Sequence, residues 1–144
     1  MVARANAYRQ ARGLAALEPD ARLFVAAERL AADLAAHGTI GHVGSDGSLP
    51  WTRVDAAGYA RTMVAENVAA GQTDAAQAVR GWIDSPPHRA NLLQAGVRHV
   101  GAAHVVGRPA CRGCAPHYWV LVLADTRGPA VSVPLACGTV VAAR

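Results

Sequence analysis

The hydrophobic residues in the first half of the chain follow the spacing of helices. They recur every three or four positions between residues 20 and 38, at Leu23, Ala27, Leu30 and Leu34. Side chains at this spacing share one face of a helix, so the pattern predicts an amphipathic helix that opens at Asp20 and ends at Gly38. A weaker helical pattern covers 6–17 and is interrupted at Gly13.

Further helices are expected in the middle of the chain, after a turn-rich loop at 39–50. A capping pattern, Thr52 to Asp55, predicts a short helix at 52–58. Asp74 is the expected cap of a helix that runs through Ile83. Ser85 followed by Pro86 predicts another helix start, because proline suits the first turn.

The last third of the chain has the shorter period of strands. Residues 118–123 are apolar at every position, so this strand needs cover on both faces. Shorter strands are expected at 63–69, at 97–106 with an interruption at Gly101, at 131–135 with Pro134 on an edge, and at 139–141. Helices followed by strands, one of them apolar on both faces, predict a sheet between two layers of helices.

Composition supports one compact domain and excludes two classes of protein. The chain has 144 residues, 52% of them hydrophobic and 17% charged. No apolar run approaches the roughly 18 residues of a membrane span. The net charge is +4, but all 14 basic residues are arginines scattered from Arg4 to Arg144. A nucleic-acid-binding protein would cluster them on one face, so no nucleic-acid partner is expected.

Three cysteines allow three interpretations. Cys111 and Cys114 form a C-x-x-C, and Cys137 lies near the C-terminus. A redox motif should lie where a strand enters a helix, whereas here a strand follows. The three thiols with His117 could bind zinc. A structural disulfide in an exported protein is the interpretation we favour. Cys137 could pair with either other cysteine if the last two strands form a hairpin.

The first six residues contain no apolar stretch of a secretion signal. The protein is therefore either cytosolic or has lost a leader, and the expected disulfide favours the second.

Two segments in the middle third carry candidate chemistry. The first is E-N-V-A-A-G at 66–71 and the second is W-I-D-S-P-P-H-R-A-N-L-L at 82–93. With His42 upstream, Glu66 and His88 supply one carboxylate and two imidazoles. Such a set can bind zinc with an open fourth position, transfer protons, or hold loops together by hydrogen bonds.

These motifs, taken in order, resemble the CAP (or SCP) superfamily of cysteine-rich secretory proteins, antigen 5 and pathogenesis-related-1 proteins, and in particular its bacterial secreted branch. The resemblance covers about 6–125. Its parts are Asn6-x-x-Arg9-x-x-x-Gly13-Leu14-x-x-Leu17, His42-x-x-x-Asp46-Gly47, Ala57-Gly58-Tyr59, the two segments above, Val100-Gly101 and Tyr118-Trp119-Val120. It implies an α+β fold, a three-layer α-β-α sandwich with a mostly antiparallel sheet. Residues 1–144 would form a single domain, with 126–144 as a C-terminal strand extension.

The family's cleft is lined by two histidines and two acidic residues. His42 and Glu66 match the first histidine and the acid of the E-N motif, and His88 of the bacterial motif is preferred to His117 as the second imidazole. Ser85 stands where the second acid would be. The expected site is therefore His42, Glu66 and His88, with zinc or another divalent cation as a candidate ligand. Structural hydrogen bonding remains an alternative role for Glu66 and His88.

The expected function is ligand or metal binding by a secreted or cell-envelope monomer, with a small molecule, lipid or cell-wall component as the ligand. No catalytic residue is assigned. One alternative is a metal-dependent hydrolase of peptide or cell-wall material, and another is an interaction module that uses the loop at 110–116. A serine nucleophile would have to be Ser45 or Ser85, and Ser85 is better explained as a helix cap.

The three tryptophans are assigned by their neighbours. Trp82 and Trp119 are expected in the core. Trp51, beside Pro50 in a loop, is expected to be exposed or at the rim of the cleft.

Overall fold

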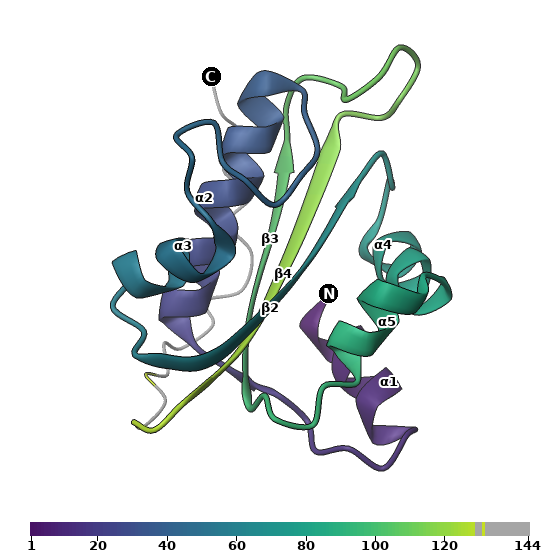
Figure 1. The fold of residues 1–144 in the computed structure, drawn as a ribbon. Helices are drawn as coiled ribbons and strands as arrows, with labels where there is room; N and C mark the ends of the chain where they lie inside the picture. The colour runs from purple at the N-terminus through teal and green to yellow at the C-terminus, as the bar shows by residue number, and fades with distance from the viewer. Residues whose placement is uncertain (129–130, 132–144) are drawn as a thin grey trace.

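A four-stranded sheet lies between two layers of helices in the computed structural model, which describes residues 1–128 and 131 (Figure 1). The strands are β1 (Glu18–Pro19), β2 (Arg61–Ala70), β3 (His99–Val106) and β4 (His117–Thr126), in the order β1-β3-β4-β2. β4 is antiparallel to both neighbours, and β1 is parallel to β3. The expected α+β sandwich with a mostly antiparallel sheet is confirmed.

The helices divide between the two faces of the sheet (Figure 1). α2 (Ala21–His37) and α3 (Pro50–Ala56) cover one face, while α1 (Val2–Gln10), α4 (Ala75–Asp84) and α5 (Pro86–Leu92) lie on the other. Successive side chains of β4 alternate between the hydrophobic cores on the two faces of the sheet. Val120 and Val122 pack in the α2 core, whereas Leu121 and Leu123 pack in the core beneath α4 and α5. The strand that is apolar on both faces is therefore covered on both, as predicted.

The helix-capping signals are confirmed for the two longest helices. The Asp20 carboxylate accepts the backbone N–H of Arg22 at the start of α2, and Gly38 ends that helix in the left-handed conformation at φ 65°. Asp74 caps α4 through the N–H groups of Ala76 and Gln77. These signals are local, which is why the sequence locates both helices well.

Two helix predictions need correction. The first helix ends at Gln10, shortly before the interruption expected at Gly13, and Asn6 holds the returning chain through two hydrogen bonds to the backbone of Leu17, at 2.8 and 2.9 Å. The helix predicted at 52–58 starts earlier, with Pro50 in its first turn. Thr52 is not its cap but a third-position residue whose hydroxyl accepts the N–H of Leu49.

The interruption that the sequence predicted at Gly101 is absent. β3 runs straight through it, and the glycine instead makes room for α2: a Cβ at this position would lie 2.1 Å from the backbone carbon of Leu23 and 2.3 Å from the nitrogen of Phe24. Glycine in a strand often marks such a close approach of another backbone. The predicted strands at 131–135 and 139–141, with Pro134, lie outside the described residues apart from Val131.

A disulfide joins Cys111 to Cys114 in the loop between β3 and β4. The prediction of a disulfide is confirmed, and the pairing of either residue with Cys137 is not. A zinc site built from these thiols and His117 is excluded, because the two sulfurs are bonded to each other. Cys137 itself lies outside the described residues.

Two glycine-to-alanine substitutions test the contact between α2 and β3. Gly101→Ala should lower the free energy of unfolding by about 3 kcal/mol, since the new methyl group meets backbone atoms that cannot move aside. Gly81→Ala is the matched control: apart from its chain neighbours and the nearby backbone of its own helix, no atom lies within 4 Å of the new Cβ. Gly81 is an interior position of α4, so this change should be neutral or stabilising by up to about 1 kcal/mol. Urea denaturation measures both, and equal effects would refute the close approach.

Candidate functional site

The E-N motif lies on β2, the edge strand of the sheet, and its two residues point to opposite faces. Glu66 points towards α3, with a side chain only 2% exposed, and Asn67 points towards α5. Because no strand among the described residues pairs with the outer side of β2, groups from both helix layers can approach each other around this edge.

Arg53 of α3 holds the Glu66 carboxylate. Its Nη2 donates to Oε2 at 2.9 Å and to Oε1 at 3.2 Å, and the Arg53 side chain is 1% exposed. The same guanidinium donates to the carbonyl oxygens of His42 and Ser48, at 3.0 and 2.7 Å. Arg53 therefore ties the loop between α2 and α3 to the edge strand. No sequence pattern signals this role, because an arginine in a short helix usually lies on the surface.

His42 is attached to the other side of the same carboxylate. Its Nδ1 lies 2.9 Å from Glu66 Oε1, while the imidazole itself is 49% exposed. The hydrogen bond to Glu66 raises the pKa of His42 above its usual value, and partial burial opposes that rise. Nδ1 therefore donates to the carboxylate. No hydrogen bond from the described part of the chain reaches Nε2.

The other face of the edge strand holds His88 through an amide network. Asn91 donates to the Asn67 side-chain oxygen at 2.9 Å and to the Glu66 carbonyl at 3.2 Å, and Asn67 donates to the His88 carbonyl at 3.0 Å. These bonds fix α5 against β2. The structural hydrogen bonding expected as an alternative role is therefore present at the backbone carbonyls of Glu66 and His88.

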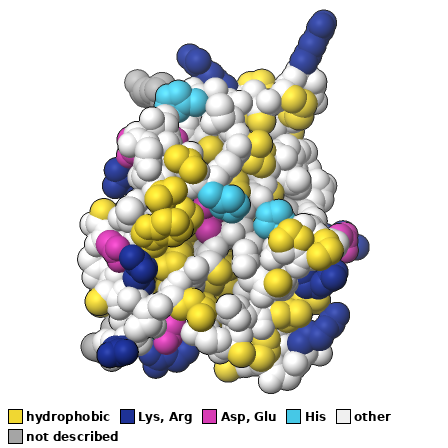
Figure 2. Space-filling view, in the orientation of Figure 1, with side chains coloured by type: hydrophobic (Ala, Val, Ile, Leu, Met, Phe, Trp, Pro, Cys, Tyr) yellow, Lys and Arg dark blue, Asp and Glu magenta, His cyan; other side chains and the backbone are white. Residues whose placement is uncertain are grey.

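His88 also has its Nδ1 occupied. That atom lies 2.8 Å from the hydroxyl oxygen of Ser85, the residue before α5. Ser85 holds the N-cap position as predicted, but its hydroxyl contacts the imidazole and not the helix backbone. Burial lowers the pKa of His88, and the charge of His42 lowers it further. Figure 2 shows histidine side chains gathered near the centre of this face, beside acidic and hydrophobic side chains.

The structure joins two of the three residues predicted from the sequence. Glu66 contacts His42 directly, whereas no hydrogen bond or ion pair among the described residues links the imidazole of His88 to either side chain. Within residues 1–128 and 131, no group of three or more His, Cys, Asp or Glu side chains is placed to hold a metal. What the site offers is two imidazoles, each with Nδ1 fixed by a partner.

Neither serine forms a complete catalytic arrangement. The Ser45 hydroxyl and backbone N–H both bond to Asp33, so Ser45 is not paired with His42. Ser85 contacts His88, yet this is a local contact across one helical turn. No third group within the described residues orients the far side of that imidazole, as a nucleophile–base pair requires.

An exposed aromatic side chain lies on α3, the helix that carries Arg53. Trp51 is 46% exposed, in line with the expectation of an exposed residue, while Trp82 and Trp119 are buried as predicted. A shallow groove of about 430 Å³ runs beside the edge strand, lined by Trp51, Arg61, Thr62, Met63 and Val64.

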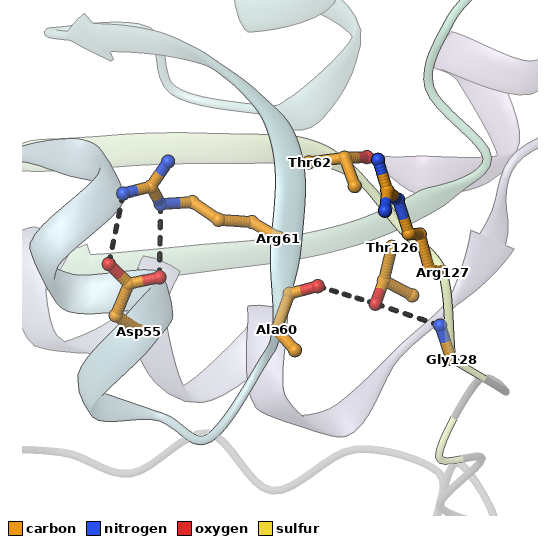
Figure 3. A pocket seen from close by; sticks show the side chains of 7 residues that line it. All are labelled: Asp55, Ala60, Arg61, Thr62, Thr126, Arg127 and Gly128. Carbon is orange, nitrogen blue, oxygen red and sulfur yellow. Dashed lines mark hydrogen bonds and ion pairs between the residues drawn. The ribbon is translucent and has the colours of Figure 1, made fainter.

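A second pocket, of about 510 Å³, lies where β2 begins and β4 ends (Figure 3). Its polar groups contact one another: Arg61 pairs with Asp55 at 3.0 Å, and the Thr126 hydroxyl donates to the Ala60 carbonyl at 2.6 Å and accepts the N–H of Gly128 at 3.2 Å. These contacts close the end of the sheet, so we assign this pocket a structural role.

Comparison with known proteins identifies the fold and the family. The model of the cysteine-rich secretory protein family, CAP, matches residues 2–123. The chain belongs to the CAP family. The family resemblance inferred from the sequence motifs is thereby confirmed.

One curated relative is a bacterial protein. An uncharacterized protein of Bacillus subtilis, YkwD, is 29% identical over 100 residues, which cover 69% of this chain and 39% of that protein. The CAP chain thus spans about two fifths of this relative.

Two solved structures share the fold. An outer surface protein of Borrelia burgdorferi has a TM-score of 0.76 at 21% identity, covering 88% of this chain and 90% of its own. An extracellular protein of Bacillus anthracis with an SCP domain has a TM-score of 0.72 at 21% identity, and the match covers 85% of this chain and 38% of that protein's chain. No helix in the described part of the chain has the length and apolar character to cross a bilayer.

The two histidines should titrate apart. In proton NMR, the pKa of His42 should lie above 6.5 and that of His88 below it. Glu66→Gln should bring the His42 value down, and His42→Ala should raise the His88 value. The pKa of His42 is higher in the folded state than in the unfolded state. Its contact with Glu66 therefore stabilises the fold fully at pH values below the unfolded-state pKa of His42. That contribution is lost as the pH rises through the folded-state pKa. Coincident titrations, unchanged by either substitution, would contradict this geometry.

Proposed function

We propose that this CAP domain is an exported, monomeric binding protein whose ligand contacts the Nε2 atoms of His42 and His88. The observation that supports this most is the fixing of both Nδ1 atoms, by Glu66 at 2.9 Å and by Ser85 at 2.8 Å. The Glu66 carboxylate sets the tautomer of His42, the two partners fix the directions of the rings, and Nε2 of each ring is left for a ligand.

Glu66 acts as a positioning residue in this proposal and not as a ligand. Its two oxygens already accept hydrogen bonds from Arg53 and His42. Because both oxygens already have donors, neither is free to bind a metal or to accept a proton from a substrate. The same argument counts against the alternative of a metal-dependent hydrolase, which needs a carboxylate free to accept a proton.

A divalent cation such as zinc fits the donor chemistry of the two imidazoles. His42 and His88 would hold it through Nε2, and water or a polar group of the ligand would complete its coordination. The cation would supply a positive centre for a carboxylate, phosphate or hydroxyl group on a small molecule, lipid or cell-wall component. The exposed indole of Trp51 would contact the rest of such a ligand.

Two observations support export to the cell surface or beyond. The solved structures with this fold include an outer surface protein and an extracellular protein. The Cys111–Cys114 disulfide is of the kind that persists in oxidising compartments.

Calorimetric zinc titration tests the two-imidazole site. His42→Ala and His88→Ala should each abolish the binding seen in the wild-type protein. Glu66→Gln should weaken it by about 10- to 100-fold, as expected for a residue that orients a ligand. His37→Ala is the control, because that side chain is bonded to the backbone of Asp33 and not to the site. Equal zinc binding by the wild-type protein and all four variants would refute the metal part of the proposal.

Assays on peptide and cell-wall substrates test binding against catalysis. With zinc present, the protein should show no turnover above that of the His42→Ala/His88→Ala variant, because the carboxylate is engaged and no nucleophile is completed. Turnover that a chelator removes and that Glu66→Gln abolishes would contradict the proposal and establish the hydrolase.

A further inference from the structure

We propose that the outer edge of β3 is a docking surface for the C-terminal segment of this chain, which pairs with β3 as a parallel strand through Val133 and Leu135. The expected C-terminal strand thereby receives a definite place in the fold. This contact shares no residue with the His42–His88 site, so it stands or falls independently of the function proposed above.

β1 covers only the beginning of the outer edge of β3. It pairs with His99 and Val100, the Asp20 N–H donates to the Val100 carbonyl at 3.0 Å, and the chain then turns into α2. Since that carbonyl faces away from β4, the backbone groups of every second residue after Val100 also face away from β4. These groups belong to Ala102, His104 and Val106.

This outward row of N–H and C=O groups has no hydrogen-bond partner within the described residues. The alternation is confirmed just past the strand, where the Gly107 N–H points the other way and donates to the Pro116 carbonyl at 2.9 Å. The His104 side chain does not cap the edge, because its Nε2 lies 2.9 Å from Nδ1 of His117 on β4. A row of unpaired backbone groups is a template for a further strand.

The opposite edge of the sheet is capped by side chains. On β2, the Trp82 indole N–H donates to the Val68 carbonyl at 3.1 Å, and the Asn91 amide donates to the Glu66 carbonyl at 3.2 Å. Side chains of α4 and α5 thus satisfy two outward carbonyl groups of that strand. No described side chain does the same for β3, so a further strand is expected at β3.

α2 follows β3 along its whole length. A Cβ on Gly101 would lie 2.1 Å from the backbone carbon of Leu23, and a Cβ on Gly107 would lie 2.4 Å from the carbonyl oxygen of Ala35. These contacts are 12 residues apart on the helix (23 to 35) and 6 apart on the strand (101 to 107), or about 18 and 20 Å. A strand added beside β3 therefore lies under one flank of α2.

That flank of α2 carries the half-buried side chain of Phe24. The other flank faces the α2–α3 loop, because Asp33 accepts hydrogen bonds from Ser45. Phe24 and Asp33 are nine residues apart, which is about 2.5 turns of helix, so they lie on opposite sides. Phe24 is thus available to pack on apolar side chains of a strand beside β3.

Val131, the last residue that the structure describes, is held at the start of the uncovered edge. Its N–H donates to the Asp20 carboxylate at 3.0 Å, and its carbonyl accepts the Ala21 N–H at 3.2 Å. Val131 therefore lies beside the residue at which β1 leaves β3. Thirteen residues follow it in the sequence. The uncovered edge is about 13 Å long, so four or five extended residues cover it.

The ladder of β1 sets the register when it is continued along β3. Val133 donates its N–H to the Ala102 carbonyl and accepts the His104 N–H. Leu135 donates to the His104 carbonyl and accepts the Val106 N–H. One strand of this length therefore satisfies most of the outward row.

The side chains of the segment suit this register. Val133 and Leu135 both face α2, where they pack beside Phe24. The backbone of Pro134, between them, faces away from β3, so its missing N–H removes no hydrogen bond of the ladder. The proline then also prevents another strand from pairing with the new edge.

Amide hydrogen exchange of the full chain, followed by NMR, tests this placement. In the wild-type protein, the N–H groups of His104 and Val106 should exchange as slowly as those of Ala103 and Val105, which face β4. Leu135→Pro removes one ladder donor and should speed exchange at His104 and Val106 by at least about tenfold. Ala103 and Val105 are the internal control and should stay protected, which also shows that the variant is folded.

Ala143→Pro is the matched control variant, because it places a proline in the same segment beyond the pairing residues, and it should leave all four rates unchanged. A nuclear Overhauser contact between the Leu135 methyl groups and the ring of Phe24, the single phenylalanine of the chain, should confirm the register. Fast exchange at His104 and Val106 in the wild-type protein would overturn the proposal. Protection that survives Leu135→Pro, or that rises with protein concentration, would also overturn it, because another segment or a second copy would then cover the edge.

Discussion

The buried ion pair between Glu66 and Arg53 determines how the site is built. A carboxylate with 2% of its side chain exposed cannot remain charged without partners, and Arg53 supplies them together with His42. Arg53 also binds the backbone of the loop that carries His42. One buried charge therefore holds together α3, the α2–α3 loop and the edge strand, and the exposed imidazole takes its position from this arrangement.

The alternation of side chains along β2 explains why the E-N pair occurs as two adjacent residues. Glu66 serves the α2–α3 layer, and Asn67 serves the α5 layer through Asn91 and the His88 backbone. Because β2 is the edge strand, the two layers can present His42 and His88 around the same border of the sheet. The site is thus a property of the sandwich as a whole, although only one strand carries the motif.

Local signals made much of the fold predictable from sequence. The period of α2, the caps Asp20 and Asp74, and the two-sided apolar strand each depend on residues near one another in the chain. What could not be predicted depends on contacts between distant segments. The role of Gly101 is set by the backbone of α2, and the end of α1 by the bonds between Asn6 and Leu17. In the site, the H-x-x-x-D-G, E-N and S-P-P-H-R motifs predicted His42, Glu66 and His88 as candidates, but Arg53 and the contact between His104 and His117 appear only once the register and the layers are known.

A double-mutant cycle on Arg53 and Glu66 tests the central claim most directly. Arg53→Met or Glu66→Leu alone leaves a buried charge without its partner, and each should lower the free energy of unfolding by about 3–5 kcal/mol. The double variant removes both charges and should lose clearly less than the sum of the two single losses. Urea denaturation of the four proteins measures these values. Additive losses would contradict an account in which this ion pair organises the site.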